Sequence, residues 1–385
     1  MKKLVVIISV ASIMLKATAQ SSFVFQHLNT TNGLSYIGIN DMCTDRKGNL
    51  WIATGNGLNM FNGKTVEKYY ASEYPQLQNS NVIHVTCDSS NRIWVLTANG
   101  NVTMLDEKRQ LHRTVLYEKN EFVKTRWILN SQHGSIILFT EKGHYALRDQ
   151  ISLSPGDSLV QKHFSFLPVR GYDTLLPKKH RQVFYYDDDN YLLVREEAFF
   201  KVNYRTKMVE KKYEIPHCTA LVKWRENELL AYDRSTNEVK SIDLSTGQIS
   251  FPFKDLKDQT GKPITAFFYY AEKIGADKYI LTTYNEGIYI YNTRTRKIYN
   301  YRHNIGDPSS LGNNVQSTLA VGLKGWVFIT CNPNGISYFN TDDFMGNQNI
   351  FADNKGNGYD GYIAGIATKD NNTYYAGTVD GMLEW

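Results

Sequence analysis

The sequence has few of the residues that metal or redox sites need. Its 385 residues include only four cysteines, Cys43, Cys87, Cys218 and Cys331, and contain no C-x-x-C pair. Zinc sites and disulfide-rich scaffolds depend on closely spaced cysteines, so neither is expected. We expect four free, mostly buried thiols, with Cys43 and Cys87 on opposite faces of their strands, and no cofactor.

Signatures of catalysis are also missing. The nine histidines are scattered, with no H-x-H or H-E-x-x-H pattern, and no G-x-S-x-G occurs. The clustered carboxylates of Asp187, Asp188 and Asp189 could bind calcium or act as acid and base. We interpret them as a solvated turn and predict no metal site and no enzyme activity.

Charge of one sign and long hydrophobic runs are equally scarce. The formal net charge is +5, and Lys2, Lys3 and Lys16 belong to an N-terminal leader whose removal lowers it to +2. A near-neutral chain without a polybasic run is not expected to bind nucleic acid. After the leader, no segment approaches the roughly 18 apolar residues that a membrane span needs.

The N-terminus has the pattern of a secretory signal peptide. Lys2 and Lys3 precede an apolar run at residues 4–15, which ends at Ala17-Thr18-Ala19. We therefore predict a signal peptide at 1–19, with cleavage near Ala19, and a mature chain that is periplasmic or secreted. No cysteine follows the apolar run, so a lipoprotein anchor is not expected.

An internal repeat dominates what remains. The clearest unit, residues 45–61, begins Asp-Arg-Lys-Gly-Asn-Leu-Trp and recurs at 88–100. Further copies place residues equivalent to Trp51 at positions 94, 137, 280, 327 and 375. The long gap between 137 and 280 has room for two degenerate copies, and the candidates are residues 191–194 and 228–232.

Each unit consists of short runs of β-branched and aromatic residues separated by Gly, Asn and Asp turns. Four strands in 43 to 50 residues is the period of a propeller blade. We predict an all-β chain, a β-propeller of seven to eight four-stranded blades over residues 20–385. Residues 23–28 could complete the blade that ends at Trp385, which gives eight blades. The competing count is seven blades plus the first blade of a second propeller.

The repeated residues themselves are expected to be structural. Asp45 and Gly48-Asn49 suit the turn between the first two strands, and Trp51 and Trp94 suit the space between blades. Residues that bind a ligand should therefore lie in the less regular hairpins.

The stretch 28–35, the run 39–42 and the unit 45–61 resemble the two-component regulator propeller repeat. The resemblance implies the periplasmic sensor portion of a hybrid two-component histidine kinase. Proteins of that family usually carry two seven-bladed propellers, a β-sandwich, a membrane helix and a kinase. They sense carbohydrate fragments. This chain has no kinase motif, so we expect the start of such a sensor, or a truncated or free-standing relative.

Hairpins between second and third strands share one face of a propeller with the links between blades. Their amides, charges and aromatic rings suit the hydroxyl groups of an oligosaccharide. Two alternatives stay open, namely a propeller that binds another protein, such as a second propeller or a homodimer partner, and a propeller glycosidase or lyase. The candidate ligand-binding residues are Asn56, Asn99, Lys142, His144, Tyr284, Asn285, Glu286, Asn332 and Asn334.

Overall fold

The computed structural model of the chain describes residues 23–130, 136–148, 151–167, 183–187, 189–195, 198–203, 206, 208–225, 227–342, 363–368, 374–378 and 381–384. The signal peptide predicted at 1–19 lies outside these residues. None of the helices within them is long and apolar enough to cross a membrane. The chain divides into a larger unit, Phe25–Asp342, and a smaller one, Met1–Val24 with Asp343–Trp385.

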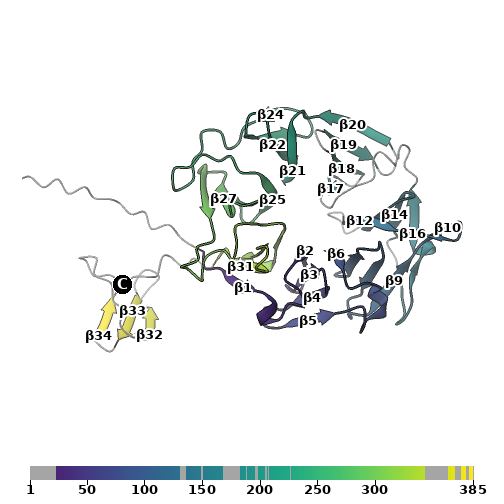
Figure 1. Ribbon diagram of the computed structural model, residues 1–385, viewed down its shortest axis with the longest axis horizontal. Helices are drawn as coiled ribbons and strands as arrows, with labels where there is room; N and C mark the ends of the chain where they lie inside the picture. The colour runs from purple at the N-terminus through teal and green to yellow at the C-terminus, as the bar shows by residue number, and fades with distance from the viewer. Residues whose placement is uncertain are drawn as a thin grey trace, which may run out of the picture. The chain divides into compact units, whose positions relative to one another are not determined.

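The described part of the larger unit is a ring of seven four-stranded blades, with the first strand of each blade nearest the axis (Figure 1). Neighbouring strands within each of these blades are antiparallel, as expected for consecutive hairpins. Blade 1 comprises β2 (Ile39–Thr44), β3 (Leu50–Thr54), β4 (Gly57–Phe61) and β5 (Val66–Tyr69), and blade 2 comprises β6 (Val82–Cys87), β7 (Ile93–Thr97), β8 (Val102–Leu105) and β9 (Leu111–Val115). Blade 3 comprises β12 (Thr125–Asn130), β13 (Ile136–Thr140), β14 (His144–Leu147) and β16 (Phe164–Leu167), and blade 4 comprises β17 (Val183–Tyr185), β18 (Asn190–Arg195), β19 (Ala198–Asn203) and β20 (Met208–Glu214).

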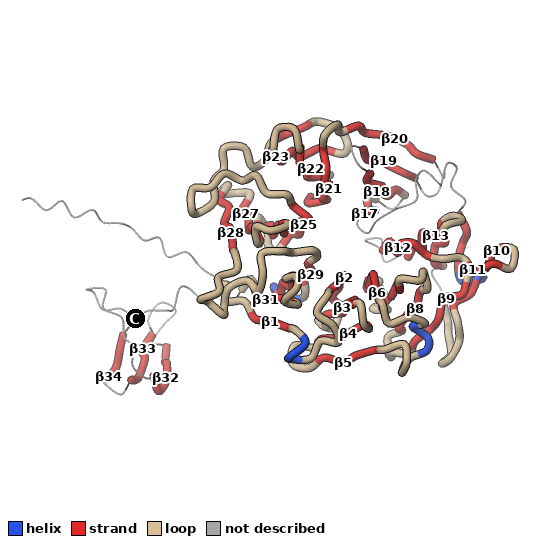
Figure 2. Tube along the Cα trace, in the orientation of Figure 1, coloured by secondary structure: helices blue, strands red, loops and turns tan. Residues whose placement is uncertain are grey.

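Blade 5 comprises β21 (Cys218–Arg225), β22 (Glu228–Asp233), β23 (Glu238–Asp243) and β24 (Ile249–Ser250). Blade 6 comprises β25 (Phe268–Lys273), β26 (Lys278–Thr283), β27 (Ile288–Asn292) and β28 (Lys297–Tyr301). Blade 7 comprises β29 (Leu319–Val321), β30 (Trp326–Thr330), β31 (Ile336–Asn340) and β1 (Gln26–Leu28). β15 (Leu159–Val160) adds a parallel strand to blade 2, and β10 (Tyr117–Glu118) pairs with β11 (Glu121–Phe122). Strands fill the ring, and the described helical turns are short (Figure 2): η1 (Thr30–Asn32), η2 (Pro75–Leu77), η3 (Gln161–His163) and η4 (Leu323–Gly325).

The ring closes after seven blades, which is one of the two counts that the sequence allowed. β1 could have completed the blade that ends at Trp385, but it pairs with β31, with Gln26 opposite Tyr338 and Leu28 opposite Ile336. Phe25 packs against Phe339 at a ring distance of 5.2 Å. Blade 7 already contacts blade 1, because Thr44 donates a hydrogen bond to the Val321 carbonyl at 2.9 Å. No room remains for another blade at this junction.

The two degenerate copies predicted between 137 and 280 are confirmed. Residues 191–194 lie in β18 and 228–232 lie in β22, each the second strand of its blade. The last copy, around residue 375, lies in the smaller unit. There β32 (Ile363–Thr368), β33 (Tyr374–Thr378) and β34 (Gly381–Glu384) form a three-stranded antiparallel sheet.

The hydrophobic core of the larger unit is divided among the spaces between neighbouring blades. One cluster between blades 1 and 2 joins Trp51 and Leu58 with Val85, Ile93 and Val95. Fully burying a side chain of this size stabilises a fold by about 1.5–3 kcal/mol. Each blade is therefore held mainly by its neighbours, which is why a closed ring is stable.

The repeated Asp-to-Trp unit has the structural role predicted for it. The Asp45 carboxylate accepts hydrogen bonds from the backbone N–H groups of Lys47 and Asn49 at 2.8 and 3.0 Å, which fixes the turn. Gly48 has φ +86°, a conformation that favours glycine. The Trp51 indole donates to the same carboxylate at 3.0 Å, so the turn is tied to the inter-blade core.

None of the four cysteines forms a disulfide, as predicted. Cys218 and Cys331 are buried, whereas Cys43 and Cys87 are half-buried. Cys43 lies opposite Trp51, while Cys87 lies one residue beyond the position opposite Trp94, so the two thiols are on opposite faces of their strands. Both pack into the cluster between blades 1 and 2.

Candidate functional site

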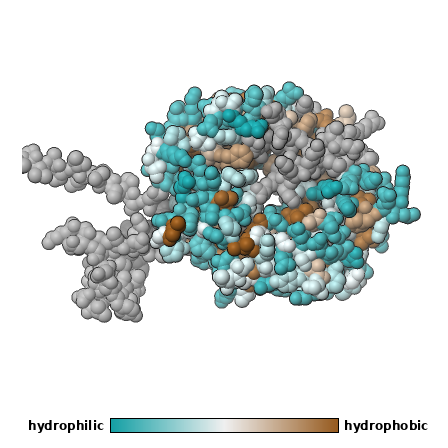
Figure 3. All heavy atoms as spheres, in the orientation of Figure 1, coloured by the Kyte–Doolittle hydropathy of each residue, from teal (hydrophilic) through white to brown (hydrophobic). Residues whose placement is uncertain are grey.

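Antiparallel strands place successive hairpins at alternate ends of a blade. The hairpins between second and third strands, together with the links between blades, therefore share one face of the ring, here called the upper face. Seen along the shortest axis, the visible surface is mostly hydrophilic, with hydrophobic residues in small separate groups (Figure 3). On the described part of this visible face, a binding site would therefore depend on specific side chains rather than on a broad apolar patch.

The hairpin of blade 6 carries three predicted residues at once, Tyr284, Asn285 and Glu286. Its shape is set by Thr283, whose hydroxyl accepts from the Glu286 N–H at 2.8 Å and donates to the Gly287 carbonyl at 2.7 Å. Gly287 has φ +75°, and an added Cβ would lie 2.2 Å from the Tyr301 carbonyl oxygen. Tyr284, which follows Thr283 in this turn, is 57% exposed.

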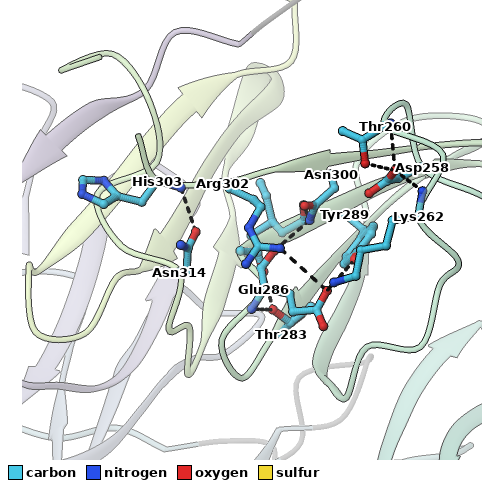
Figure 4. A network of polar contacts seen from close by, with 12 residues as sticks. Asp258, Thr260, Lys262, Thr283, Glu286, Tyr289, Asn300, Arg302, His303 and Asn314 are labelled. Carbon is cyan, nitrogen blue, oxygen red and sulfur yellow. Dashed lines mark hydrogen bonds and ion pairs between the residues drawn. The ribbon is translucent and has the colours of Figure 1, made fainter. Parts of the chain in front are cut away.

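Glu286 is the centre of a polar network whose members come from separate segments (Figure 4). Its Oε2 accepts hydrogen bonds from Lys262 Nζ at 2.8 Å and from the Tyr289 hydroxyl at 3.0 Å. Arg302 lies 3.9 Å from the same oxygen. The other oxygen, Oε1, has no hydrogen-bond partner among the described residues, so it remains a fixed acceptor.

The surrounding turns hold this network in place. The Asp258 carboxylate accepts from the backbone N–H of Lys262 at 3.0 Å, which positions the lysine. The Asn300 side chain donates to the Glu286 carbonyl at 2.8 Å and is itself in a strand of blade 6. The carboxylate is thus oriented before any ligand arrives.

Electrostatics favour an ionised Glu286. Burial on its own raises the pKa of the Glu286 carboxyl, but hydrogen bonds from Lys262 and Tyr289 and the charges of Lys262 and Arg302 lower it below its usual value. Burial, followed by the charge of Glu286, raises the pKa of Tyr289. Glu286 therefore acts as a hydrogen-bond acceptor and Tyr289 as a donor at neutral pH.

A row of aromatic rings continues from Tyr284 toward blade 5. Neighbouring centroids are 6.1 Å apart for Tyr284 and Tyr269, 5.3 Å for Tyr269 and Phe267, and 5.5 Å for Phe267 and Tyr232. Tyr269 occupies a β-bulge in the inner strand β25, which changes the direction of its side chain. At the end of the row, the Tyr232 hydroxyl donates a hydrogen bond to Asn237, which lines a groove of about 310 Å³.

The link between blades 6 and 7 joins this site to the two predicted asparagines of blade 7. Backbone hydrogen bonds connect it to both hairpins, from Gly287 to Asn314 and from Asn332 to Val315. The side chain of Asn332 donates to Ser317 at 3.0 Å, and that of Asn334 donates to the Gly312 carbonyl at 2.7 Å. These asparagines hold the link beside the blade 6 hairpin.

The other predicted residues are not brought together with this group. Asn56, Asn99 and Lys142 are exposed, but they lie in the hairpins of blades 1, 2 and 3. His144 is fully buried, with its ring 4.2 Å from Phe139 and a hydrogen-bond distance of 3.3 Å to the Tyr191 hydroxyl. A ligand on the upper face does not reach it, so His144 is not kept as a candidate.

Sequence reasoning missed a cluster on the inner strands. Asp41, His84 and Trp127 occupy equivalent positions in blades 1, 2 and 3. His84 pairs with Asp41 through Nδ1, contacts the Ile128 carbonyl through Nε2 at 3.0 Å, and stacks on Trp127 at 4.0 Å. An alignment of the first strands of the repeat copies would have placed these three residues at the same position and so revealed this cluster.

The predicted aspartate turn fits its structural interpretation. Asp187 accepts a hydrogen bond from the Asp189 N–H at 2.9 Å and another from the Asn190 side chain at 2.8 Å. Asp188 lies outside the described residues. Across the part of the chain that the structure describes, no three His, Cys, Asp or Glu side chains are grouped to hold a metal ion.

Comparison with known proteins confirms the predicted repeat. Residues 33–56 match the family profile described as Two component regulator propeller. The match covers the end of the first link and the first half of blade 1. A search of curated proteins found no match.

Solved structures share the fold. The extracellular domain of the hybrid two-component system BT3049 from B. thetaiotaomicron is 15% identical with a TM-score of 0.62, and the match covers 94% of this chain and 48% of that one. The corresponding domain of BT4673 is 14% identical with a TM-score of 0.59, over 94% and 45%. The chain thus spans about half the length of these two domains.

Similar propellers also include an enzyme. Virginiamycin B lyase from Staphylococcus aureus is 15% identical with a TM-score of 0.55, and the match covers 83% of this chain and 99% of the lyase. At such identities the likeness establishes the β-propeller fold, and the functional argument must come from the site itself.

Proposed function

We propose that this chain, which carries a two-component regulator propeller repeat, is the extracytoplasmic ligand-binding propeller of a sensor, and that its ligand is a carbohydrate fragment. The carrying observation is the blade 6 hairpin. It presents an exposed Tyr284 beside a Glu286 carboxylate that is fixed through a single oxygen. The side-chain amide of Asn285, next to both, has no hydrogen-bond partner among the described residues.

These groups match the chemistry of a sugar. A pyranose has an apolar C–H face, which can pack on an aromatic ring, and a rim of hydroxyl groups, which need acceptors and donors. Tyr284 supplies a ring, Glu286 Oε1 supplies a charged acceptor, and Asn285 supplies both donor and acceptor. The row through Tyr269 and Phe267 would extend the surface for an oligosaccharide.

The fold likeness to two extracellular sensor domains and the predicted signal peptide support an extracytoplasmic location for this binding role. In the inner-strand cluster, both ring nitrogens of His84 have hydrogen-bond partners, Asp41 and the Ile128 carbonyl, so this imidazole is held in place within the ring.

The test is titration of the mature protein with a panel of plant, host and microbial oligosaccharides, followed by variants. Tyr284→Ala should weaken binding of the best oligosaccharide about fivefold or more, because it removes a ring contact worth roughly 1 kcal/mol or more. Glu286→Gln should also weaken it, through loss of a charge-assisted hydrogen bond.

Tyr117→Ala is the matched control, because Tyr117 is 54% exposed but lies on the β10–β11 hairpin. It should bind as the wild type does. A panel without any binding would refute the carbohydrate proposal and leave the protein-binding alternative. Equal losses in Tyr117→Ala and Tyr284→Ala would refute the assigned site.

A further inference from the structure

The face opposite the upper face carries a groove of about 780 Å³ between blades 2 and 3. Three segments form its walls: the turn between β6 and β7, the hairpin between β8 and β9, and residues 151–155. Hairpins that join first to second and third to fourth strands define this lower face. The groove is therefore distinct from the proposed carbohydrate site.

Comparison of adjacent blades explains why the groove exists. At the equivalent place between blades 1 and 2, Arg109 of the β8–β9 hairpin lies over the Trp51 ring at 4.5 Å and bonds to Asp45 at 2.6 Å. Blade 3 has no such short hairpin, because its third and fourth strands are joined through residues 151–163. That longer connection forms one wall and leaves the space beside the blade 2 turn open.

Arg92 provides a prepared group for an anion in this groove. Its Nε donates to Asp88 Oδ2 at 2.7 Å, and the Asp88 side chain is fully buried. The two terminal amino groups of Arg92 have no hydrogen-bond partner among the residues described. A guanidinium fixed in this way presents two parallel N–H donors, which match the two oxygens of a carboxylate.

Charges around Arg92 favour the same ligand. Lys108 lines the groove, and its ammonium has no partner within the described ranges. Arg46 and Lys47 are exposed on the neighbouring turn, which contacts blade 2 through the Arg46 N–H and Asn91. Two acids in the lining oppose them, the exposed Glu107 and Asp106, whose Oδ1 accepts hydrogen bonds from the backbone N–H groups of Lys108 and Gln110. Their charges should weaken anion binding.

The opposite wall is apolar. Ile151, Leu153 and Pro155 line it, and Met104 of β8 contributes from the adjacent blade. A ligand that fits both walls must therefore combine an anionic head with an aliphatic part.

We propose that this groove binds carboxylate-bearing ligands with a short aliphatic portion. The carboxylate engages the Arg92 fork and the Lys108 ammonium, and the aliphatic part packs on Ile151 and Leu153. Such a ligand can be a free aliphatic acid or an acidic side chain that a peptide presents next to apolar residues.

The probe is hexanoate, and the readout is the chemical shift of the Ile151 and Met104 methyl groups in the full mature chain. Wild type should show saturable shifts with hexanoate, and much smaller ones with hexanamide. Lys108→Gln and Arg92→Gln should each weaken binding, the latter about tenfold or more, because it removes the charge-assisted fork. Glu107→Gln should strengthen binding, since it removes the opposing charge.

Lys64→Gln is the matched control, because Lys64 is exposed on the lower-face turn of blade 1 and does not line the groove. It should leave the affinity unchanged. Because Arg92→Gln could disturb the Asp88 turn, the opposite effects of Lys108→Gln and Glu107→Gln decide the matter. If these two variants bind hexanoate equally, or hexanamide binds as well as hexanoate, the proposal is overturned.

A second arm separates the two sources of the carboxylate. A blocked Leu-Glu-Leu tripeptide is titrated in parallel with hexanoate. Tighter binding of the tripeptide, with the same response to Lys108→Gln, supports a polypeptide ligand, whereas tighter hexanoate binding supports a free acid. Neither result depends on the carbohydrate titrations, because Tyr284→Ala should not change hexanoate binding.

Discussion

Replacement of Asp45 by alanine should destabilise the propeller strongly. The side chain of Asp45 is fully buried and accepts hydrogen bonds from the Trp51 indole at 3.0 Å, the Asn49 amide at 2.9 Å and the Arg109 guanidinium at 2.6 Å. Two backbone N–H groups of the turn bond to its other oxygen. Without the carboxylate, all these donors lose their acceptor, and Arg109 loses its counter-charge.

The magnitude follows from the burial of this pair. Removing one partner of a buried ion pair costs about 3–5 kcal/mol. The Arg109 side chain keeps 22% of its surface exposed, and water can partly replace the lost partner. We therefore expect the lower end of that range, about 3 kcal/mol, for Asp45→Ala.

Urea unfolding followed by tryptophan fluorescence measures this loss, because Trp51 and Trp94 are fully buried in the ring. Asp307→Ala is the control, since Asp307 only fixes a surface turn through Ser309. It should cost much less. Equal losses in the two variants would refute the role assigned to Asp45.

The same residue predicts a pH dependence. Burial alone raises the pKa of Asp45, but hydrogen bonds from Trp51, Asn49 and Arg109 outweigh it and lower the pKa below its usual value. A lowered folded-state pKa adds stability above the unfolded value of about 3.9, and this stability is lost as the pH falls through the folded value. As the pH falls below about 4, the free energy of unfolding of Asp45→Asn should therefore decrease less than that of the wild type.

Three further variants test other parts of the structure. Burial lowers the pKa of His144 to about 3. As the pH falls below the unfolded-state pKa of about 6.5, this residue should therefore reduce the free energy of unfolding of the wild type by about 1.4 kcal/mol per pH unit. His144→Phe should have a shallower slope in urea unfolding between pH 7 and 5, and an unchanged slope would refute this. Gly287→Ala should cost more than about 2 kcal/mol, because strain at positive φ adds to a backbone clash, whereas Gly261→Ala, with φ +85° and open space, should cost about 1 kcal/mol; equal thermal shifts would contradict the geometry. Phe25→Ala should cost about 3–5 kcal/mol and speed proteolysis within β1, and unchanged cleavage would argue against closure by β1.

Local patterns were enough to predict most of the fold. Runs of β-branched and aromatic residues between Gly and Asn turns fix the strand period, so even the weak copies at 191–194 and 228–232 were found. The closure was not predictable in the same way. Two blades offered a third strand that β1 could pair with, β31 and β34, and their local patterns are alike. Contacts between blades 7 and 1, which are distant in the sequence, decide between them.

The candidate site was predicted in part. A shared face for the hairpins follows from strand order, so Tyr284, Asn285 and Glu286 could be named from the sequence. Their partners could not, since Lys262 and Arg302 come from links without a repeat pattern.

His144 shows the opposite error. It was assigned to a hairpin, but β14 already begins at this residue, opposite Phe139 in the neighbouring strand. An error of one residue in a strand boundary moved a buried side chain onto the predicted surface.

The most direct test of the proposed function is a structure of the mature protein with the oligosaccharide that binds best. We predict a sugar ring packed against Tyr284, with a hydroxyl group within hydrogen-bond distance of Glu286 Oε1 and the Lys262 and Tyr289 contacts to Oε2 intact. A saccharide bound elsewhere on the ring, with the blade 6 hairpin unoccupied, would contradict the account.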